Sequence, residues 1–284
     1  MEEHKKTGLV LEGGGMRGIY TAGVLDVFMD EGITFDGVIG VSAGAIHGCS
    51  FVSGQRGRNI RYYKKYCKDK RFMSFRNLIL TGDIAAKQFC YYDLPETLDP
   101  YDYEAFNKSK TEFYVTCSNL ETGKAEHLRL TDMKEQIELL RASASLPYVS
   151  RIVEADGMKL LDGGCTDSIP LMASARLGFK KNVVVLTRHQ GYRKEPEPSA
   201  LAPIIYHKYP EFVKAVKRRH LMYNKTLDKI SQLEQQGKIF VICPSLPLEI
   251  SRMSHDPEQL QYTYEIGIED AKGKLEAMKQ WLWG

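Results

Sequence analysis

The sequence predicts an α/β protein with three layers, α/β/α, around a mainly parallel central sheet. Two observations support this prediction. Residues 7–53 alternate in the order strand, glycine loop, helix, strand, turn, helix. Further apolar runs bounded by turn residues recur as far as residue 242, which is typical of additional strands. Of the 284 residues, 43% are hydrophobic and 26% charged, a balance that excludes a largely disordered or fibrous chain.

In the first half of the chain, local sequence patterns predict four strands and two helices. The apolar run at 7–11 suits a buried strand, and the helix predicted at 19–30 has Gly32 where a C-terminal cap belongs. A second buried strand follows at 35–41, and small apolar residues predict a tightly packed helix at 42–53. Strands at 112–117 and 125–130 flank a Thr122-Gly123 turn and form a predicted hairpin.

The second half adds four helices and several strands. We predict, in order, a helix at 133–142, strands at 151–153 and 158–161, a helix at 170–177, a strand at 182–186, a loop at 188–200, a helix at 212–235 and a strand at 238–242. A last helix begins at Asp256. Its predicted apolar stripe consists of Leu260, Tyr264, Ile268, Ala271, Leu275, Met278 and Leu282.

We therefore expect two parts of the chain. Residues 1–200 form the catalytic α/β domain, interrupted at about 55–110 by a basic, aromatic insertion of short helices outside the sheet. Residues 201–284 form a mostly helical C-terminal extension packed on that domain.

Charge, hydropathy and cysteine usage argue against several classes of protein. The net charge of +3 gives no argument for nucleic acid, and we expect no nucleic-acid partner. No apolar stretch reaches the ~18–20 residues of a membrane span, and residues 1–6 show no signal peptide. The six cysteines form no Cys-x-x-Cys pair and no metal-binding pattern. These observations predict a reduced cytoplasmic protein with no metal and no cofactor.

A nucleophile motif ends the strand at 35–41, where the chain reads Gly40-Val41-Ser42-Ala43-Gly44. A serine on a sharp strand-to-helix turn exposes its oxygen, as in a nucleophile elbow. The two glycines let the turn close without Cβ clashes, and the helix N-terminus faces the developing oxyanion. We predict Ser42 as a nucleophile, with a serine that only caps the helix as the alternative.

A second glycine motif follows the first strand and reads Gly13-Gly14-Gly15-Met16-Arg17-Gly18. It fits the dinucleotide fingerprint, but the acidic residue expected at the end of the second strand is missing. We predict an oxyanion loop whose N–H groups bind the charged oxygen of an acyl-transfer intermediate. A tight structural turn is the alternative. Arg17 is expected to support this loop, to meet a substrate phosphate, or to form a surface ion pair.

The turn after the strand at 158–161 reads Asp162-Gly163-Gly164. An aspartate at such a turn often serves the turn alone, but it also suits the base that takes the serine proton. Histidine would be the other base. His47 lies on the helix after the nucleophile and is expected to point to a different face, and His189 follows a strand without a motif.

These three motifs, in this order, resemble the patatin-like phospholipases. Residues 140–147, Leu-Arg-Ala-Ser-Ala-Ser-Leu-Pro, also resemble the segment ahead of that family's Asp motif, and the resemblance covers about residues 7–190. It implies a patatin-like fold and a Ser-Asp dyad without a catalytic histidine. It implies Ser42 as nucleophile, Asp162 as base and the loop 13–18 as oxyanion hole. Gly164 departs from the Asp-Gly-Ala of many members, and residues beyond about 200 resemble the helical extension of bacterial members.

The resemblance implies a serine hydrolase that cleaves acyl esters of lipids through an acyl-enzyme. Its expected partner is a lipid or other acyl-ester substrate. Two alternatives remain: a soluble carboxylesterase or thioesterase with the same dyad, and a non-catalytic lipid-binding protein of the same fold.

The basic segment 56–76 carries nine Lys or Arg residues against one Asp, interleaved with five aromatic residues. This composition suits peripheral contact with an anionic membrane surface. The alternative is a solvated helix face whose tyrosines pack on the core. Lys64, Lys65 and Lys68 are the expected contacts if the membrane interpretation holds.

Overall fold

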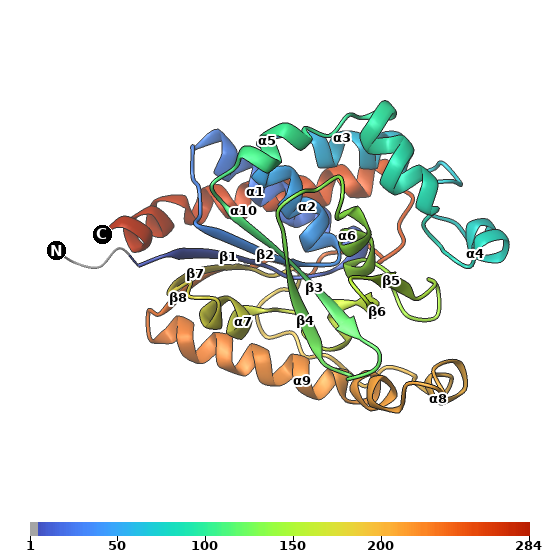
Figure 1. The fold of residues 1–284 in the computed structure, drawn as a ribbon. Coiled ribbons are helices and arrows are strands. Elements are labelled where there is room, and N and C mark those ends of the chain that lie inside the picture. Colours follow the sequence, from blue (N-terminus) through green and yellow to red (C-terminus); the bar gives the residue numbers. More distant parts are fainter. Residues whose placement is uncertain (1–4) are drawn as a thin grey trace.

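A computed structural model describes residues 5–284 and shows a mixed α/β fold with a central sheet between two helical layers (Figure 1). The sheet has eight strands in the order β5-β6-β3-β2-β1-β7-β8, with β4 paired to β3 off this path. The strands are β1 (Thr7–Leu11), β2 (Gly37–Val41), β3 (Glu112–Asn119), β4 (Ala125–Leu130), β5 (Val153–Ala155), β6 (Met158–Asp162), β7 (Lys181–Val185) and β8 (Ile239–Ile242). β3, β2, β1, β7 and β8 run parallel to their neighbours in that order, which confirms the predicted fold class.

Helices cover both faces of the sheet. On one face lie α1 (Ile19–Asp30), α2 (Ala43–Val52), α6 (Ile137–Ser143) and α10 (Pro257–Trp283), and on the other lie α7 (Leu171–Arg176) and α9 (Pro210–Gln235) (Figure 1). Successive strand side chains point to opposite faces. Leu9 and Leu11 therefore join the core under α1 and α10, whereas Val10 joins the core under α9.

The C-terminal third contributes to all three layers. β8 extends the sheet by parallel pairing with β7. α9 packs on one face, and α10 packs along α1 on the other. The predicted apolar stripe of α10 is buried, apart from the partly buried Ile268.

The insertion consists of α3 (Arg58–Tyr66), α4 (Phe75–Thr81), the π-helix η2 (Phe89–Leu98) and α5 (Tyr103–Lys108), none of which joins the sheet. Tyr62, Tyr63, Tyr66 and Phe72 are buried together in a core cluster of their own. The structure therefore confirms that the tyrosines of the basic segment pack on the core.

Several boundaries differ from the predictions by one or two residues, and the start of α6 differs by four. α6 begins at Ile137, later than the predicted residue 133, because the carboxylate of Asp132 accepts the backbone N–H groups of Lys134 and Glu135 and turns the chain there. β5 begins at Val153, also later than predicted. Residues 1–4, which carry part of the signal-peptide expectation, lie outside the described residues.

Within residues 5–284, no helix is both long enough and apolar enough to cross a membrane.

One edge of β3 is shared by two strands that meet end to end. β2 pairs with the first part of that edge and reaches Thr116 through Val41. β6 pairs antiparallel with the next positions, beginning where Asp162 pairs with Cys117. β4 occupies the opposite edge along both parts. The sheet therefore brings together the residue that follows Val41 and the last residue of β6.

Candidate active site

Ser42 lies in the sharp turn between β2 and α2. Its φ of 54° and ψ of −122° place a residue other than glycine in a strained conformation, as expected at an elbow. A Cβ at Gly40 would lie 2.6 Å from the backbone of Ala45, and one at Gly44 would lie 2.5 Å from the Leu11 carbonyl oxygen. Only glycine fits at these two positions, so the motif residues serve the turn.

The segment 140–147 connects the two predicted catalytic residues. The Ser42 N–H donates to the hydroxyl of Ser143 at 3.0 Å, and this hydroxyl donates to the Thr116 carbonyl at 2.7 Å. The Asp162 N–H donates to the Ser145 carbonyl at 2.8 Å. These contacts give a structural role to a segment that the sequence singled out only by resemblance.

Asp162 is buried at the end of β6. One carboxylate oxygen, Oδ1, accepts the Gly164 N–H at 2.7 Å, so the residue does form a turn. The other oxygen, Oδ2, is buried without a hydrogen-bond partner among the described residues. Burial raises the pKa of Asp162, and the neighbouring Ser42 hydroxyl and Gly164 N–H oppose that rise. The carboxylate therefore keeps one oxygen unengaged in a site that it shares with Ser42.

The glycine loop 13–18 lies beside the elbow. Gly15 has a φ of +58°, and a Cβ on it would lie 2.7 Å from the Arg252 carbonyl oxygen. The Met16 N–H already donates to that carbonyl at 3.2 Å. The N–H groups of Gly14 and Gly15 make no hydrogen bond among residues 5–284 and stay available as donors.

The other loop residues are close-packed around Ser42. A Cβ on Gly13 would lie 3.0 Å from the Val41 carbonyl oxygen and 3.2 Å from Ser42 Cβ, and a Cβ on Gly18 would lie 2.5 Å from Ala43 Cβ. Arg17 is only 6% exposed and forms no ion pair among the described residues, so the surface ion pair is wrong for it.

Glu12, just before the loop, is buried. Its carboxylate accepts the Thr187 N–H and the Tyr223 hydroxyl, both at 2.6 Å. Burial raises the pKa of Glu12. This residue ties the start of the loop to the segment after β7 and to α9.

The two histidines pack near tyrosine rings. His47 is fully buried with its ring 5.3 Å from that of Tyr63, and burial lowers its pKa to about 4. The His189 ring packs near that of Tyr192. Within residues 5–284, no histidine lines either cavity that reaches Ser42. The same residues hold no group of three or more His, Cys, Asp or Glu side chains suited to a metal ion.

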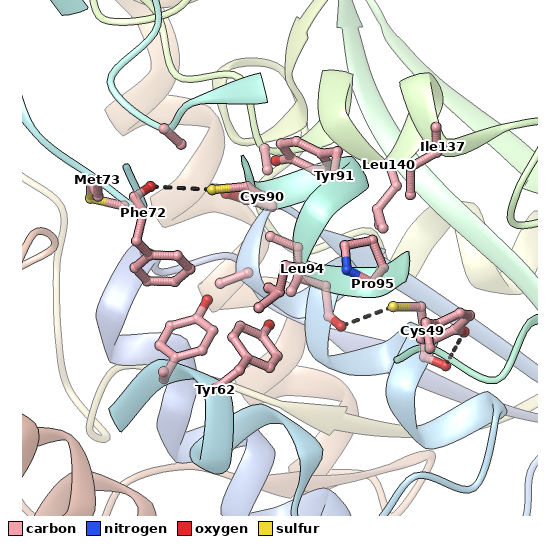
Figure 2. A pocket seen from close by; sticks show the side chains of 18 of the residues that line it. Cys49, Tyr62, Phe72, Met73, Cys90, Tyr91, Leu94, Pro95, Ile137 and Leu140 are labelled. Carbon is pink, nitrogen blue, oxygen red and sulfur yellow. Dashed lines mark hydrogen bonds between the residues drawn. The ribbon is translucent and has the colours of Figure 1, made fainter. Parts of the chain in front are cut away.

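Two cavities meet at Ser42. The apolar cavity runs under the insertion and is lined mainly by side chains of α2, α3, η2 and α6 (Figure 2). Tyr62, Phe72, Tyr91, Leu94 and Leu140 are among its walls. The cationic cavity lies between the glycine loop, Asp162 and α9, and its cations are Arg17, Arg188, Lys194, Arg219 and Arg252.

No motif surrounds the cations from Arg188 onwards, so the sequence does not predict them as site residues. Glu12, Ser143 and Ser145 are also not predicted individually. For the two serines, the only signal was the resemblance of the segment 140–147.

Comparison with known proteins identifies two matched regions. The patatin-like phospholipase model matches residues 9–174, and a model described as a domain of unknown function matches residues 209–283. Uncharacterized protein YjjU of Escherichia coli is 28% identical over 275 residues, which cover 91% of this chain and 74% of that protein.

Fungal relatives match a smaller part. Lysophospholipase NTE1 of Debaryomyces hansenii is 26% identical over 64% of this chain, and lysophospholipase nte1 of Emericella nidulans is 29% identical over 61%. The chain spans only 12% and 11% of those two proteins. Among solved structures, VipD from Legionella pneumophila aligns with a TM-score of 0.45 and 14% identity, covering 96% of this chain and 67% of that one.

Proposed function

Because the chain belongs to the patatin-like phospholipase family, we propose that it hydrolyses acyl esters of lipids, with Ser42 as nucleophile and Asp162 as general base. One observation carries the proposal. Ser42 stands in a strained elbow where an apolar cavity and a polar cavity containing Asp162 meet. This arrangement suits a lipid ester, because the apolar cavity can hold its acyl chain and the polar cavity can hold its alcohol part.

In the first half of the reaction, Ser42 Oγ attacks the ester carbonyl carbon while its proton passes to the Asp162 carboxylate. The carbonyl electrons move onto the oxygen, which the N–H groups of Gly14 and Gly15 stabilise. When the tetrahedral intermediate collapses, the bond to the alcohol breaks and Asp162 returns the proton to the leaving oxygen. The acyl group stays on Ser42 as an ester.

In the second half, a water molecule takes the place of the alcohol. Asp162 accepts one of its protons as the water oxygen attacks the acyl carbonyl carbon. The bond to Ser42 Oγ then breaks, and the proton on Asp162 passes to that oxygen. A free carboxylic acid leaves, and Ser42 and the Asp162 carboxylate are restored.

The apolar cavity suits the acyl chain. Its walls are aromatic and aliphatic along most of their length, and burial of each CH₂ group contributes about 0.8 kcal/mol. Cys49 and Cys90 in its wall are held by hydrogen bonds between their thiols and backbone carbonyls (Figure 2). An acyl chain bound there leads directly to Ser42.

The enzyme meets its substrate at a membrane surface through the rim of this cavity. Met73 and Ala85 line the cavity on either side of α4, and α4 exposes Phe75, Ile79 and Leu80. α8 (Ala202–Ile205) exposes Ile204 and Ile205 and lies at the same end of the molecule as α4 (Figure 1). The exposed lysines Lys64, Lys65 and Lys68 add positive charge to the insertion, which favours an anionic surface.

A panel of lipids and short soluble esters, assayed with the wild type and Ser42→Ala, tests the proposal. We expect hydrolysis of aggregated long-chain lipids that the substitution abolishes. Ser50→Ala is the matched control, because Ser50 is a buried serine of α2 that bonds to Asn59 and lines neither cavity. Hydrolysis of soluble esters alone would favour the soluble esterase or thioesterase, and no Ser42-dependent hydrolysis would favour the lipid-binding protein.

A further inference from the structure

Four charged side chains form an ion cluster, the Glu197 cluster, at the cationic cavity. The Glu197 carboxylate lies at its centre, in the loop after β7. Lys194 Nζ lies 2.5 Å from this carboxylate, Arg219 Nη1 lies 3.0 Å away, and Arg252 Nη2 lies 3.1 Å away. The three cations all line the cavity that contains Asp162. One carboxylate therefore holds three cations together beside the predicted catalytic residues.

Arg219, on α9, connects the cluster to the turn that holds the Asp162 carboxylate. Arg219 Nε donates to the Gly164 carbonyl at 2.5 Å. The N–H of the same glycine donates to Asp162 Oδ1 at 2.7 Å. A Cβ on Gly164 would lie 3.1 Å from Arg219 Nη2, so the absence of a side chain there suits this contact. A shift of Arg219 would therefore reach Asp162 through a single residue.

Arg252, in the loop before α10, connects the cluster to the oxyanion loop. Its carbonyl oxygen accepts the Met16 N–H at 3.2 Å. The same oxygen would lie 2.7 Å from a Cβ on Gly15, so it packs closely against the loop. The two N–H groups proposed to stabilise the oxyanion, those of Gly14 and Gly15, come directly before this anchored N–H. The backbone of Arg252 thus supports the oxyanion loop, while its side chain is held by Glu197.

The charge on Glu197 is what keeps the cluster together. Partial burial opposes its ionisation, but the hydrogen bond from Lys194 and the charges of the three cations lower the pKa of Glu197 to about 2. Glu197 is therefore a carboxylate at neutral pH. Among residues 5–284, no other carboxylate lies within ion-pair distance of the three cations. Without the charge on Glu197, like charges would face one another at this point.

The cluster joins the two matched regions of the chain. The oxyanion loop and the Asp162 turn lie in the patatin-like region, residues 9–174. Arg219 and Arg252 lie in the second region, residues 209–283, whose model is described as a domain of unknown function. Glu197 lies between the two regions. The second region therefore contacts both predicted catalytic loops of the first, and one carboxylate connects the two contacts.

We propose that Glu197 is a positioning residue that couples the oxyanion loop to the Asp162 turn, and that residues 209–283 thereby complete the active site. This inference rests on the proposed function for the chemical roles of the two loops. Glu197 lines neither cavity that reaches Ser42, so it acts through Arg219 and Arg252. Acyl transfer needs the oxyanion donors and the base in place together, and a misplacement of about 1 Å can lower a rate about 100-fold.

Glu197→Gln tests the coupling by kinetics, because the amide keeps the size of the side chain and removes its charge. The Glu197 side chain is 43% exposed, so water can solvate the cations left behind and the fold should survive. With a short, monomeric, uncharged ester, we expect kcat to fall at least about tenfold, and KM to change by a smaller factor.

Asp228→Asn is the matched control. Asp228 pairs with Arg193 and so joins the same loop to α9, but it forms no hydrogen bond or ion pair with the Glu197 cluster in the described part of the chain. This variant should keep the kcat of the wild type. An equal fall in kcat in both variants would mean that Glu197 only fastens the loop to α9, and would overturn the proposal.

Hydrogen exchange followed by mass spectrometry tests the same coupling without catalysis. In Glu197→Gln, amide exchange should become faster both in residues 13–18 and in residues 162–168, because both segments lose support. Arg252→Gln should affect mainly the first segment and Arg219→Gln mainly the second, because each arginine contacts only one of them. Unchanged exchange of either segment in Glu197→Gln would overturn the coupling.

The outcomes separate this inference from the proposed function. Ser42-dependent hydrolysis whose kcat is unchanged in Glu197→Gln would overturn the positioning role alone. Hydrolysis that survives Ser42→Ala would instead overturn the proposed function. In that case, faster exchange of both segments in Glu197→Gln would still support the coupling between them.

Discussion

The hydroxyl of Ser143 bridges the backbone N–H of Ser42 and the carbonyl of Thr116, at 3.0 and 2.7 Å. It therefore fixes the strained elbow to β3, whose next residue, Cys117, pairs with Asp162 of β6. Ser143 touches the Ser42 backbone and not its reacting oxygen. We infer that it is a positioning residue.

Ser143→Ala should lower both turnover and stability. The substitution leaves the buried Ser42 N–H without its partner, which costs about 1–3 kcal/mol. On a monomeric ester, kcat should fall by a larger factor than the factor by which KM changes, because the nucleophile loses its orientation. Ser50→Ala removes a comparable buried hydroxyl and should lower the melting temperature without the fall in kcat. Equal kcat losses in the two variants would mean that Ser143 is only structural.

Asp162→Asn should lower kcat at least about 100-fold, because general-base catalysis typically contributes that much. The amide oxygen can still accept the Gly164 N–H, so the turn is expected to survive. Asp167→Asn is the control, since Asp167 lies in the following turn and pairs with His127 at 3.0 Å. A loss below tenfold for Asp162→Asn, or an equally large loss in His189→Ala, would contradict the dyad.

The rate should fall at acidic pH with a midpoint above the ordinary carboxyl pKa of about 3.9. Burial raises the pKa of Asp162, so this residue holds its proton to a higher pH and cannot act as a base below that value. The measurement is kcat/KM of an uncharged ester against pH, with the fold checked by circular dichroism. Because burial also raises the pKa of Glu12, the acidic limb must persist in Glu12→Gln. A rate that stays constant down to pH 4 would exclude Asp162 as the base.

Replacement of Phe75, Ile79 and Leu80 by serine should weaken binding to anionic vesicles. These side chains of α4 are 67%, 84% and 66% exposed, and the residues Met73 and Ala85 on either side of α4 line the apolar cavity. Burial of apolar surface in the bilayer contributes roughly 25 cal/mol per Å². A variant with serine at Leu221 and Leu246, two exposed leucines away from α4, should bind vesicles like the wild type. Vesicle binding that survives the α4 substitutions would place the contact elsewhere.

Local patterns in the sequence predict the parts of the site that depend on the backbone. The elbow at Ser42 and the glycine loop follow from small residues between a buried strand and a helix, and both lie where the sequence places them. The apolar stripe of α10 follows from helical periodicity. These features involve neighbours in the chain, so their signals are local.

The remaining parts depend on long-range pairing. Asp162 meets Ser42 only because β6 pairs with the edge of β3 that β2 leaves free, and strand pairing has no local signature. Arg219 and Arg252 reach the site through the packing of α9 and the loop before α10. A basic residue on a helix gives no sign of whether it will face solvent or a cavity. The basic segment 56–76 shows the same difficulty, since its lysines are exposed while its tyrosines line a core.

The measurement that tests the central claim most directly is peptide mapping by mass spectrometry after reaction with a fluorophosphonate probe. The account predicts one covalent adduct, on Ser42, formed in parallel with the loss of lipid hydrolysis and absent from Ser42→Ala. An adduct on another residue, or full inactivation in which Ser42 stays unmodified, would contradict it.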